Sequence, residues 1–131
     1  MNDYTRVTSV ISAFSGLHLI DPDLLKKAAD KGTSIHDYIE SVFKGEWTGL
    51  MDEDIVPYLE SFHEFWEDHK RLYDGFEVEI EKRLYCDDLK ITGKIDLIFK
   101  NKHRTYAIDW KTGTRKQKTW FLQGSAYKFL L

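Results

Sequence analysis

Two carboxylates and a lysine in the second half of the chain have the types and the spacing of a hydrolytic metal site. Asp109 and Lys111 flank Trp110, and Asp96 precedes Asp109 by thirteen residues. Alternate residues of a strand share a face, so Asp109 and Lys111 should point the same way while Trp110 points into the core. Hard divalent cations prefer carboxylate ligands, and a nearby ammonium can stabilise charge on a phosphate. The pattern predicts metal-assisted hydrolysis of a phosphodiester.

The strand pairing expected around these residues brings three acids together. A polar turn over residues 101–104, centred between Lys102 and His103, makes paired positions sum to 205, so Asp96 lies opposite Asp109. In the preceding hairpin, a turn centred on residues 87–88 makes paired positions sum to 175, so Glu79 lies opposite Asp96. This arithmetic predicts a cross-strand row of Glu79, Asp96 and Asp109 that ends beside Lys111.

Such a row of acids would destabilise the sheet unless a cation neutralised it. Like charges on adjacent strands repel each other, and a bound divalent ion would offset that cost. The alternative is an ordinary solvated sheet face on which acids gather without a function. Glu79 is a possible third ligand, whereas Glu77 and Glu81 are interpreted as plain surface acids.

Composition favours one globular domain. The 131 residues are 42% hydrophobic and 15% aromatic, enough to bury a core. We expect a single domain over residues 1–131, with a helical part over 1–75 and a catalytic sheet and helix over 76–131. The sequence has neither an apolar run of membrane-spanning length nor the pattern of a signal peptide, so a cytoplasmic location is expected. Cys86 is the only cysteine, which argues against an internal disulfide and against a zinc or iron–sulfur site.

Charge is distributed unevenly along the chain. The net charge is -3, but residues 1–99 carry 11 Lys and Arg against 21 Asp and Glu, whereas residues 100–131 carry 8 against one acid. A basic run is usually just a solvated face. Here it adjoins the acid pair, so it predicts contacts with nucleic-acid phosphates that salt would weaken. The substrate-binding candidates that follow the acids are Arg115, Lys116 and Lys118, with Lys100, Lys102 and Arg104 in the turn before them.

The order of the expected elements indicates an α/β or α+β fold with a small mixed sheet. Strands are predicted over 76–86, 90–100 and 104–111, as an antiparallel meander. Helices are predicted from a cap at Thr8 or Ser9 to Leu17, from Pro22 to a stop at Lys31-Gly32, from a cap at Thr33 or Ser34 to Gly45, over 53–73, and from about Lys116 onward. In the last helix Trp120, Phe121, Ala126 and Phe129 are the expected packing residues.

Four sequence blocks occur in a fixed order: His36 within residues 28–40, Gly93-Lys94-Ile95-Asp96, Asp109-Trp110-Lys111, and Gln123 followed by Tyr127. In these blocks the chain resembles the RecB-type (lambda-exonuclease/RecB-like) nucleases of the PD-(D/E)XK superfamily. Their pattern is a histidine, then G-x-x-D, D-x-K and Q-x-x-x-Y. The resemblance implies a restriction-endonuclease-like core with N-terminal helices and a C-terminal helix, in which a final strand can be missing.

The resemblance also assigns roles to single residues. It implies that Asp96, Asp109 and His36 hold Mg2+ or Mn2+, together with the backbone carbonyl of Trp110, and that Lys111 assists catalysis with the two acids. His36 should lie at the start of a helix, where it could equally be an exposed histidine. Lys111 could also be a simple ion-pair partner, which is compatible with catalysis.

Gln123 and Tyr127 lie four residues apart and should share a helix face. In the family such residues help to position the substrate or the lysine. Alternatively, Tyr127 packs over the sheet with Gln123 at its rim.

The implied activity is a metal-dependent deoxyribonuclease, and exonuclease action on single-stranded or duplex DNA ends in recombination, repair or replication is the family's usual form. A structure-specific endonuclease and a non-catalytic DNA-binding scaffold remain the alternatives. The family's iron–sulfur branch needs four cysteines, so no such cluster is expected with Cys86 alone. Relatives usually add a strand after the last helix, so we also expect a longer native chain, a bare sheet edge, or an edge covered by a homo-oligomer or partner protein.

Overall fold

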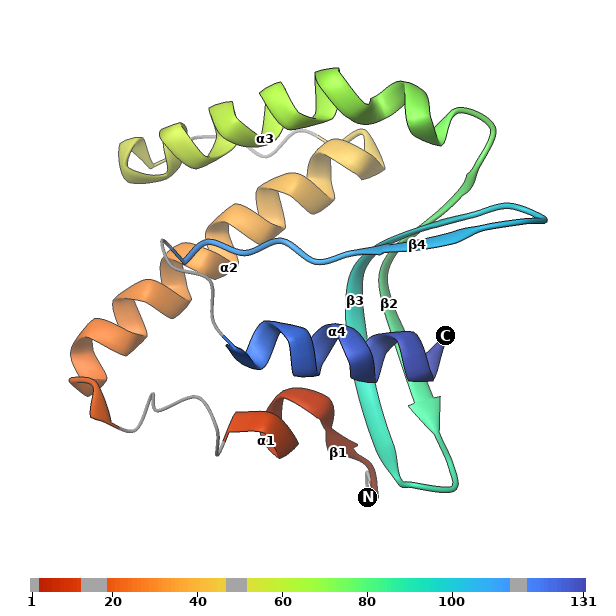
Figure 1. Ribbon diagram of the computed structural model, residues 1–131. Coiled ribbons are helices and arrows are strands. Elements are labelled where there is room, and N and C mark those ends of the chain that lie inside the picture. The colour runs from red at the N-terminus through yellow and green to blue at the C-terminus, as the bar shows by residue number, and fades with distance from the viewer. Residues whose placement is uncertain (1–2, 13–18, 47–51, 114–117) are drawn as a thin grey trace.

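The computed structural model describes residues 3–12, 19–46, 52–113 and 118–131 (Figure 1). Within them the strands are β1 (Thr5–Arg6), β2 (Glu77–Cys86), β3 (Ile91–Lys100) and β4 (Thr105–Ile108). The helices are α1 (Val7–Ile11), α2 (Pro22–Lys44), α3 (Val56–His69) and α4 (Lys118–Leu130), with short 3-10 helices at Glu53–Ile55 and Lys70–Tyr73. The mixed α/β class with a small mixed sheet, predicted from the sequence, is confirmed.

Strand β3 is the centre of the sheet. Antiparallel β2 pairs with it along one edge. The other edge is shared, because parallel β1 pairs at Ile91 and Thr92 while antiparallel β4 pairs from Leu97 to Lys100. Between these two partners residues 93–96 of β3 have no strand partner on that edge in the described part of the chain. We call these four residues the fork, because they separate the part of this edge that pairs with β1 from the part that pairs with β4.

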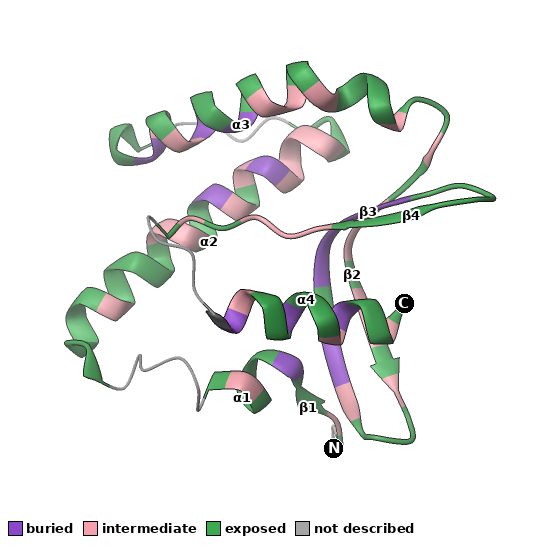
Figure 2. Cartoon of the chain, viewed as in Figure 1, coloured by how far each residue is buried: buried purple, intermediate pink, exposed green. Residues whose placement is uncertain are grey.

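Helices cover both faces of β3, and Figure 2 shows how much of that strand is buried. On one face Phe99 stacks on Trp66 of α3, with ring centroids 5.8 Å apart. On the other face Ile98 belongs to an apolar cluster with Val7 of α1 and Tyr127 of α4. Neighbouring strand residues point in opposite directions, so the two cores lie on opposite sides of the sheet. The central strand is therefore packed on both faces just beyond the fork.

The two β-hairpins differ in how well their register follows from the sequence. In the β3–β4 hairpin Leu97 lies opposite Ile108, so the predicted sum of 205 is confirmed. In the β2–β3 hairpin Ile80 lies opposite Leu97, which gives 177, and the predicted 175 is wrong. The turn there spans four residues, 87–90, with Lys90 at φ 52°, so its centre lies one residue later than predicted.

Helix α2 is one continuous helix rather than the two that were predicted. The carboxylate of Asp21 accepts a hydrogen bond from the backbone N–H of Asp23 at 2.8 Å, and the predicted cap and first helical position are confirmed. The predicted stop at Gly32 is wrong. Ser34 caps no new helix, since its hydroxyl donates to the carbonyl of Asp30, four residues earlier, at 3.1 Å. Gly32 instead allows close packing, because a Cβ there would lie 3.3 Å from Oγ1 of Thr112.

The terminal helices also differ from the sequence predictions. Helix α1 begins at Val7, before the predicted caps, and Leu17 lies outside the described residues. In α4, Phe121 and Phe129 are each 63% exposed although both were expected to pack, and the buried residues are Thr119, Gln123 and Tyr127. Across the described residues, no helix combines the length and the apolar character needed to cross a membrane.

Gly93 at the fork should not tolerate a larger residue, because a Cβ there would lie 2.7 Å from the ring of Tyr127 and 3.0 Å from Leu130. We expect Gly93→Ala to lower the free energy of unfolding by about 1–3 kcal/mol. Gly124→Ala is the matched control, since no atom lies within 4 Å of a Cβ at that helical position. It should raise stability by about 0.5–1 kcal/mol. Urea denaturation measures both, and similar losses in the two variants would contradict the close contact.

Candidate functional site

The carboxylate of Asp96 joins three separate segments of the chain. Its Oδ2 accepts a hydrogen bond from the backbone N–H of Trp110 at 2.8 Å and lies 3.3 Å from Nδ1 of His36. Asp96 ends the fork, Trp110 follows β4, and His36 belongs to α2. The residue is only 9% exposed, so this arrangement places a charged group in a largely dehydrated environment.

His36 lies in the middle of α2, and the prediction that it begins a helix is wrong. Its position follows from helical periodicity, because Ile35 and Ile39 are buried against α3 and turn the adjoining face toward the sheet. The hydrogen bond with Asp96 raises the pKa of the His36 imidazole above its ordinary 6.5, although partial burial opposes the shift. Asp109 and Glu81 add to the increase through their charges.

Glu81, rather than Glu79, faces Asp96 across the sheet. Ligand atoms of Glu81, Asp96 and His36 all lie within 4.8 Å of one another. Glu79 instead lies opposite Ile98, and its half-exposed carboxylate pairs with Lys82 at 3.4 Å. The predicted place of Glu79 in the acid row is therefore wrong, and so is the interpretation of Glu81 as a plain surface acid.

The backbone at Glu81 is unusual for a strand. Its φ is 53°, in the left-handed region, and the ladder of paired residues is interrupted between Glu81 and Asp96. A non-glycine residue in such a conformation costs on the order of 1–3 kcal/mol and is found mostly at functional sites. The side chain is only 17% exposed, and its Oε2 lies 2.6 Å from Nζ of Lys94.

Asp109 and Lys111 lie directly after β4, which ends at Ile108 rather than at the predicted Lys111. The ammonium of Lys111 contacts Oδ2 of Asp109 and donates a hydrogen bond to the side-chain carbonyl of Gln123. Gln123 in turn donates to the hydroxyl of Tyr127 at 2.9 Å. A chain of polar contacts thus runs from Asp109 through Lys111 to two buried residues of α4.

Burial and neighbouring charges act in opposite directions on the pKa of Asp109. Burial raises the pKa of its carboxyl above the ordinary 3.8, the hydrogen bond from Lys111 opposes this, and the charge of Asp96 adds to it. Asp109 does not belong to the group of ligand atoms that lie within 4.8 Å of one another. The structure therefore places Asp109 and Lys111 beside the group of His36, Glu81 and Asp96 rather than within it.

The remaining candidates are placed only in part. The indole of Trp110 packs in the aromatic core, 5.4 Å from the ring of Phe62, which confirms its predicted core position. Its carbonyl as a metal ligand stays a prediction. Arg115 and Lys116 lie outside the described residues, and Lys118 is the first residue of α4.

The residues at this site fit a hard divalent cation. Among the described residues, Oδ2 of Asp109 and Oε2 of Glu81 are buried and accept no well-aligned hydrogen bond, although an ammonium lies near each. Carboxylate oxygens suit both Mg2+ and Mn2+, and Mn2+ also accepts an imidazole ligand. A pocket of about 350 Å³ opens beside His36, Glu81 and Asp96.

Alternation could not reveal Glu81, because Glu77, Glu79 and Glu81 share one strand face. Only the register distinguishes them. The predicted and the observed register differ by two residues, and apolar residues face apolar ones in both. The hydrophobic pattern therefore does not distinguish the two registers. The signal that could have identified Glu81 is the length of the turn at residues 87–90.

We expect Glu81→Gln to weaken metal binding and Glu79→Gln to leave it unchanged. A ligand that binds only the folded state stabilises it, by about 2.7 kcal/mol at one hundred times its Kd. Thermal unfolding in increasing Mg2+ or Mn2+ should therefore show the stabilisation of the wild type in Glu79→Gln and less of it in Glu81→Gln. Equal responses of Glu81→Gln and the wild type would remove Glu81 from the ligand set.

Of three comparisons with known proteins, one found a match. A sequence model of the PD-(D/E)XK nuclease superfamily matches residues 51–131, which contain every site residue named above except His36. No curated protein and no solved structure matches the chain. Nucleases of this superfamily use divalent metal ions, in keeping with the carboxylates and histidine gathered here. The match covers more than half of the chain, and the protein therefore belongs to the PD-(D/E)XK nuclease superfamily.

Proposed function

We propose that this protein is a divalent-metal-dependent deoxyribonuclease of the RecB type. One observation carries the proposal: buried Asp96 meets His36 and Glu81, with Asp109 and Lys111 directly beside them. Folding stability alone does not favour three acids in a partly dehydrated site. A bound cation would offset their repulsion, and the superfamily's chemistry gives that cation a use.

Each residue has a definite role in this proposal. Asp96, His36, Glu81 and Asp109 would hold Mg2+ or Mn2+, and the ion would supply an activated water and polarise the phosphodiester. The ammonium of Lys111 is held between Asp109 and Gln123 and would stabilise charge that develops on the phosphate. Tyr127 holds Gln123 in place through their hydrogen bond. Gln123 and Tyr127 thus position Lys111 from α4.

The proposed substrate is DNA, and the proposed action is removal of nucleotides from its ends during recombination, repair or replication. The motif blocks of RecB-type exonucleases support this form. A scaffold that only binds DNA would not need Asp96, Asp109 and Lys111. The contact of Lys111 with Asp109, and the hydrogen bond of Asp96 with the backbone of Trp110 between them, support a catalytic role instead. Internal cutting is the alternative outcome of the assay below.

Asp109→Asn and Lys111→Ala should both abolish or strongly reduce cleavage of end-labelled DNA in Mg2+ or Mn2+. Removing one group that stabilises transition-state charge lowers the rate by about 100- to 1,000-fold, which is the loss expected for Lys111→Ala. EDTA should stop the reaction. Lys26→Ala is the control, since Lys26 also pairs with an aspartate, Asp30 at 3.9 Å, but lies exposed on α2.

The same assay separates the competing functions. Mononucleotides or short products released from a labelled end indicate an exonuclease, and internal fragments indicate an endonuclease. Cleavage that persists in EDTA or in both variants would overturn the proposed mechanism. Salt-sensitive binding without any cleavage would instead favour a scaffold.

A further inference from the structure

We propose that a second pocket, formed by β1, α1, β2, β3 and α4, binds a phosphate group of the substrate strand next to the bond that is cleaved. The inference rests on the proposed nuclease function and extends it with a substrate subsite. We call this pocket the cationic pocket and define it by Arg6, Arg83 and Lys94. It lies beside the metal-ligand residues, not among them.

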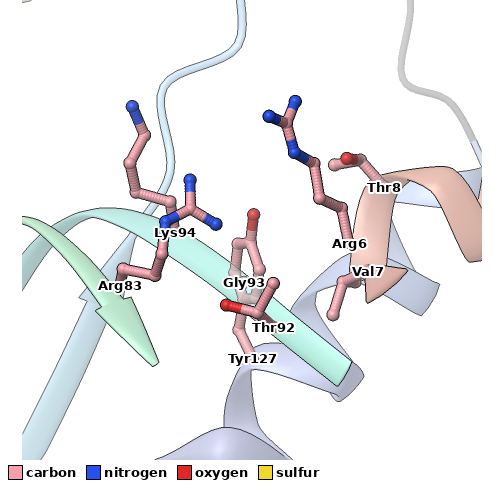
Figure 3. Close-up of a pocket in the computed structure, with 8 residues that line it drawn as sticks. All are labelled: Arg6, Val7, Thr8, Arg83, Thr92, Gly93, Lys94 and Tyr127. Atoms are coloured by element: carbon pink, nitrogen blue, oxygen red, sulfur yellow. The ribbon is translucent and has the colours of Figure 1, made fainter. Parts of the chain in front are cut away.

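The lining of the cationic pocket suits an anion. Its volume is about 310 Å³, and no acidic residue lines it. Figure 3 shows Arg6, Arg83 and Lys94 reaching up around the opening, with the hydroxyl of Tyr127 between them. Thr8 adds a hydroxyl to the same wall, whereas the hydroxyl of Thr92 donates to the carbonyl of Leu84 at 2.7 Å. Arginine forks and hydroxyl donors are the groups that recognise phosphate oxygens.

The strand register forces two of these cations together. Arg83 lies directly opposite Lys94 in the β2–β3 pair, and Arg6 is brought beside them by β1, which pairs with β3 at Thr92. Like charges opposite each other on adjacent strands destabilise a sheet. Within the described residues neither arginine has an ion-pair partner, while Lys94 pairs with Glu81. A bound anion would offset this repulsion, as a cation would among the acids.

The cationic pocket adjoins the candidate metal site. Lys94 lines both this pocket and the one beside His36, Glu81 and Asp96. Tyr127, at the pocket floor, is connected through Gln123 to Lys111. An anion held here would therefore lie next to the phosphate that is cleaved. The substrate class is a strand with at least two phosphates rather than a single nucleotide.

Arg83→Ala and Arg6→Ala test the cationic pocket, with Arg71→Ala as the control. Arg71 is an exposed arginine of the 3-10 helix before β2 and lines neither pocket. The probes are single-stranded oligonucleotides of about 12 nucleotides that carry a 5′-phosphate, a 3′-phosphate or hydroxyls at both ends. Fluorescence anisotropy in EDTA measures binding without cleavage, over a series of salt concentrations. Circular dichroism checks that each variant is folded.

We expect both pocket variants to bind about tenfold more weakly than the wild type, with a salt dependence smaller by about one phosphate contact. A loss confined to one phosphorylated end identifies a terminal phosphate, and an equal loss for all probes identifies an internal phosphodiester. Both results support the pocket. If both variants, correctly folded, match Arg71→Ala in affinity and salt dependence, the inference is wrong.

The binding measurement is independent of the proposed chemistry. If the wild type never cleaves DNA but Arg83→Ala and Arg6→Ala bind DNA more weakly, the nuclease proposal is refuted and the pocket is supported. If the wild type cleaves DNA and both variants bind it with unchanged affinity, the pocket is refuted and the nuclease proposal is supported.

Discussion

The single oxygen Oδ2 of Asp96 is the point on which the candidate site depends. It accepts the backbone N–H of Trp110 and contacts His36, so it connects the sheet, the segment after β4 and α2. Together with the packing of the Trp110 indole against Phe62, this contact fixes the chain beyond Ile108 relative to β3. Asp109 and Lys111 flank Trp110, so this contact also fixes where they lie, and Lys111 reaches Gln123 of α4 from there. A hydrogen bond to a buried carboxylate is stronger than one between neutral groups, which suits this central role.

Opposite charges are segregated over a short distance in the sheet. Asp96 and Glu81 face each other across β2 and β3, and two residues along the strands Lys94 and Arg83 do the same. The sheet therefore carries a like-charged acidic pair beside a like-charged basic pair. Lys94 with Glu81 is the contact that joins them. This arrangement is unfavourable for the protein alone and is complementary to a cation with a phosphodiester strand.

The sequence predicted the parts of the site that depend on local pattern. The turn at residues 101–104 is polar, and the side chain of Asn101 accepts hydrogen bonds from the backbone N–H groups of His103 and Arg104. The register of β3 with β4, and with it the place of Asp96, followed from this turn. The turn at 87–90 offered no comparable signal. Lys90 adopts a left-handed backbone conformation there, and lysine is not a residue type from which that conformation is expected. One turn was therefore enough to exchange Glu81 for Glu79.

Long-range packing limited the remaining predictions. Gly32 was expected to stop a helix, yet it lies within the continuous helix α2. Its lack of a side chain leaves room for Thr112, which packs closely against it. Likewise Phe121 and Phe129 of α4 were expected to pack, but both are exposed, and the buried face is the one that carries Gln123 and Tyr127. In both cases a contact from a distant part of the chain decided the outcome, and no local propensity encodes such a contact.

The fork in β3 has a consequence for where a strand of another chain could pair with this sheet. A free strand edge is a template for pairing with another chain, and sheets are usually protected by charges, bulges or covering loops. Here the free stretch is only residues 93–96, enclosed by β1 at one end and β4 at the other. That length is below the roughly five or six residues of an ordinary strand, so an incoming strand finds too little backbone to pair with. Pairing of another strand at the fork is therefore disfavoured, whereas the outer edge of β2 has no strand partner among the described residues.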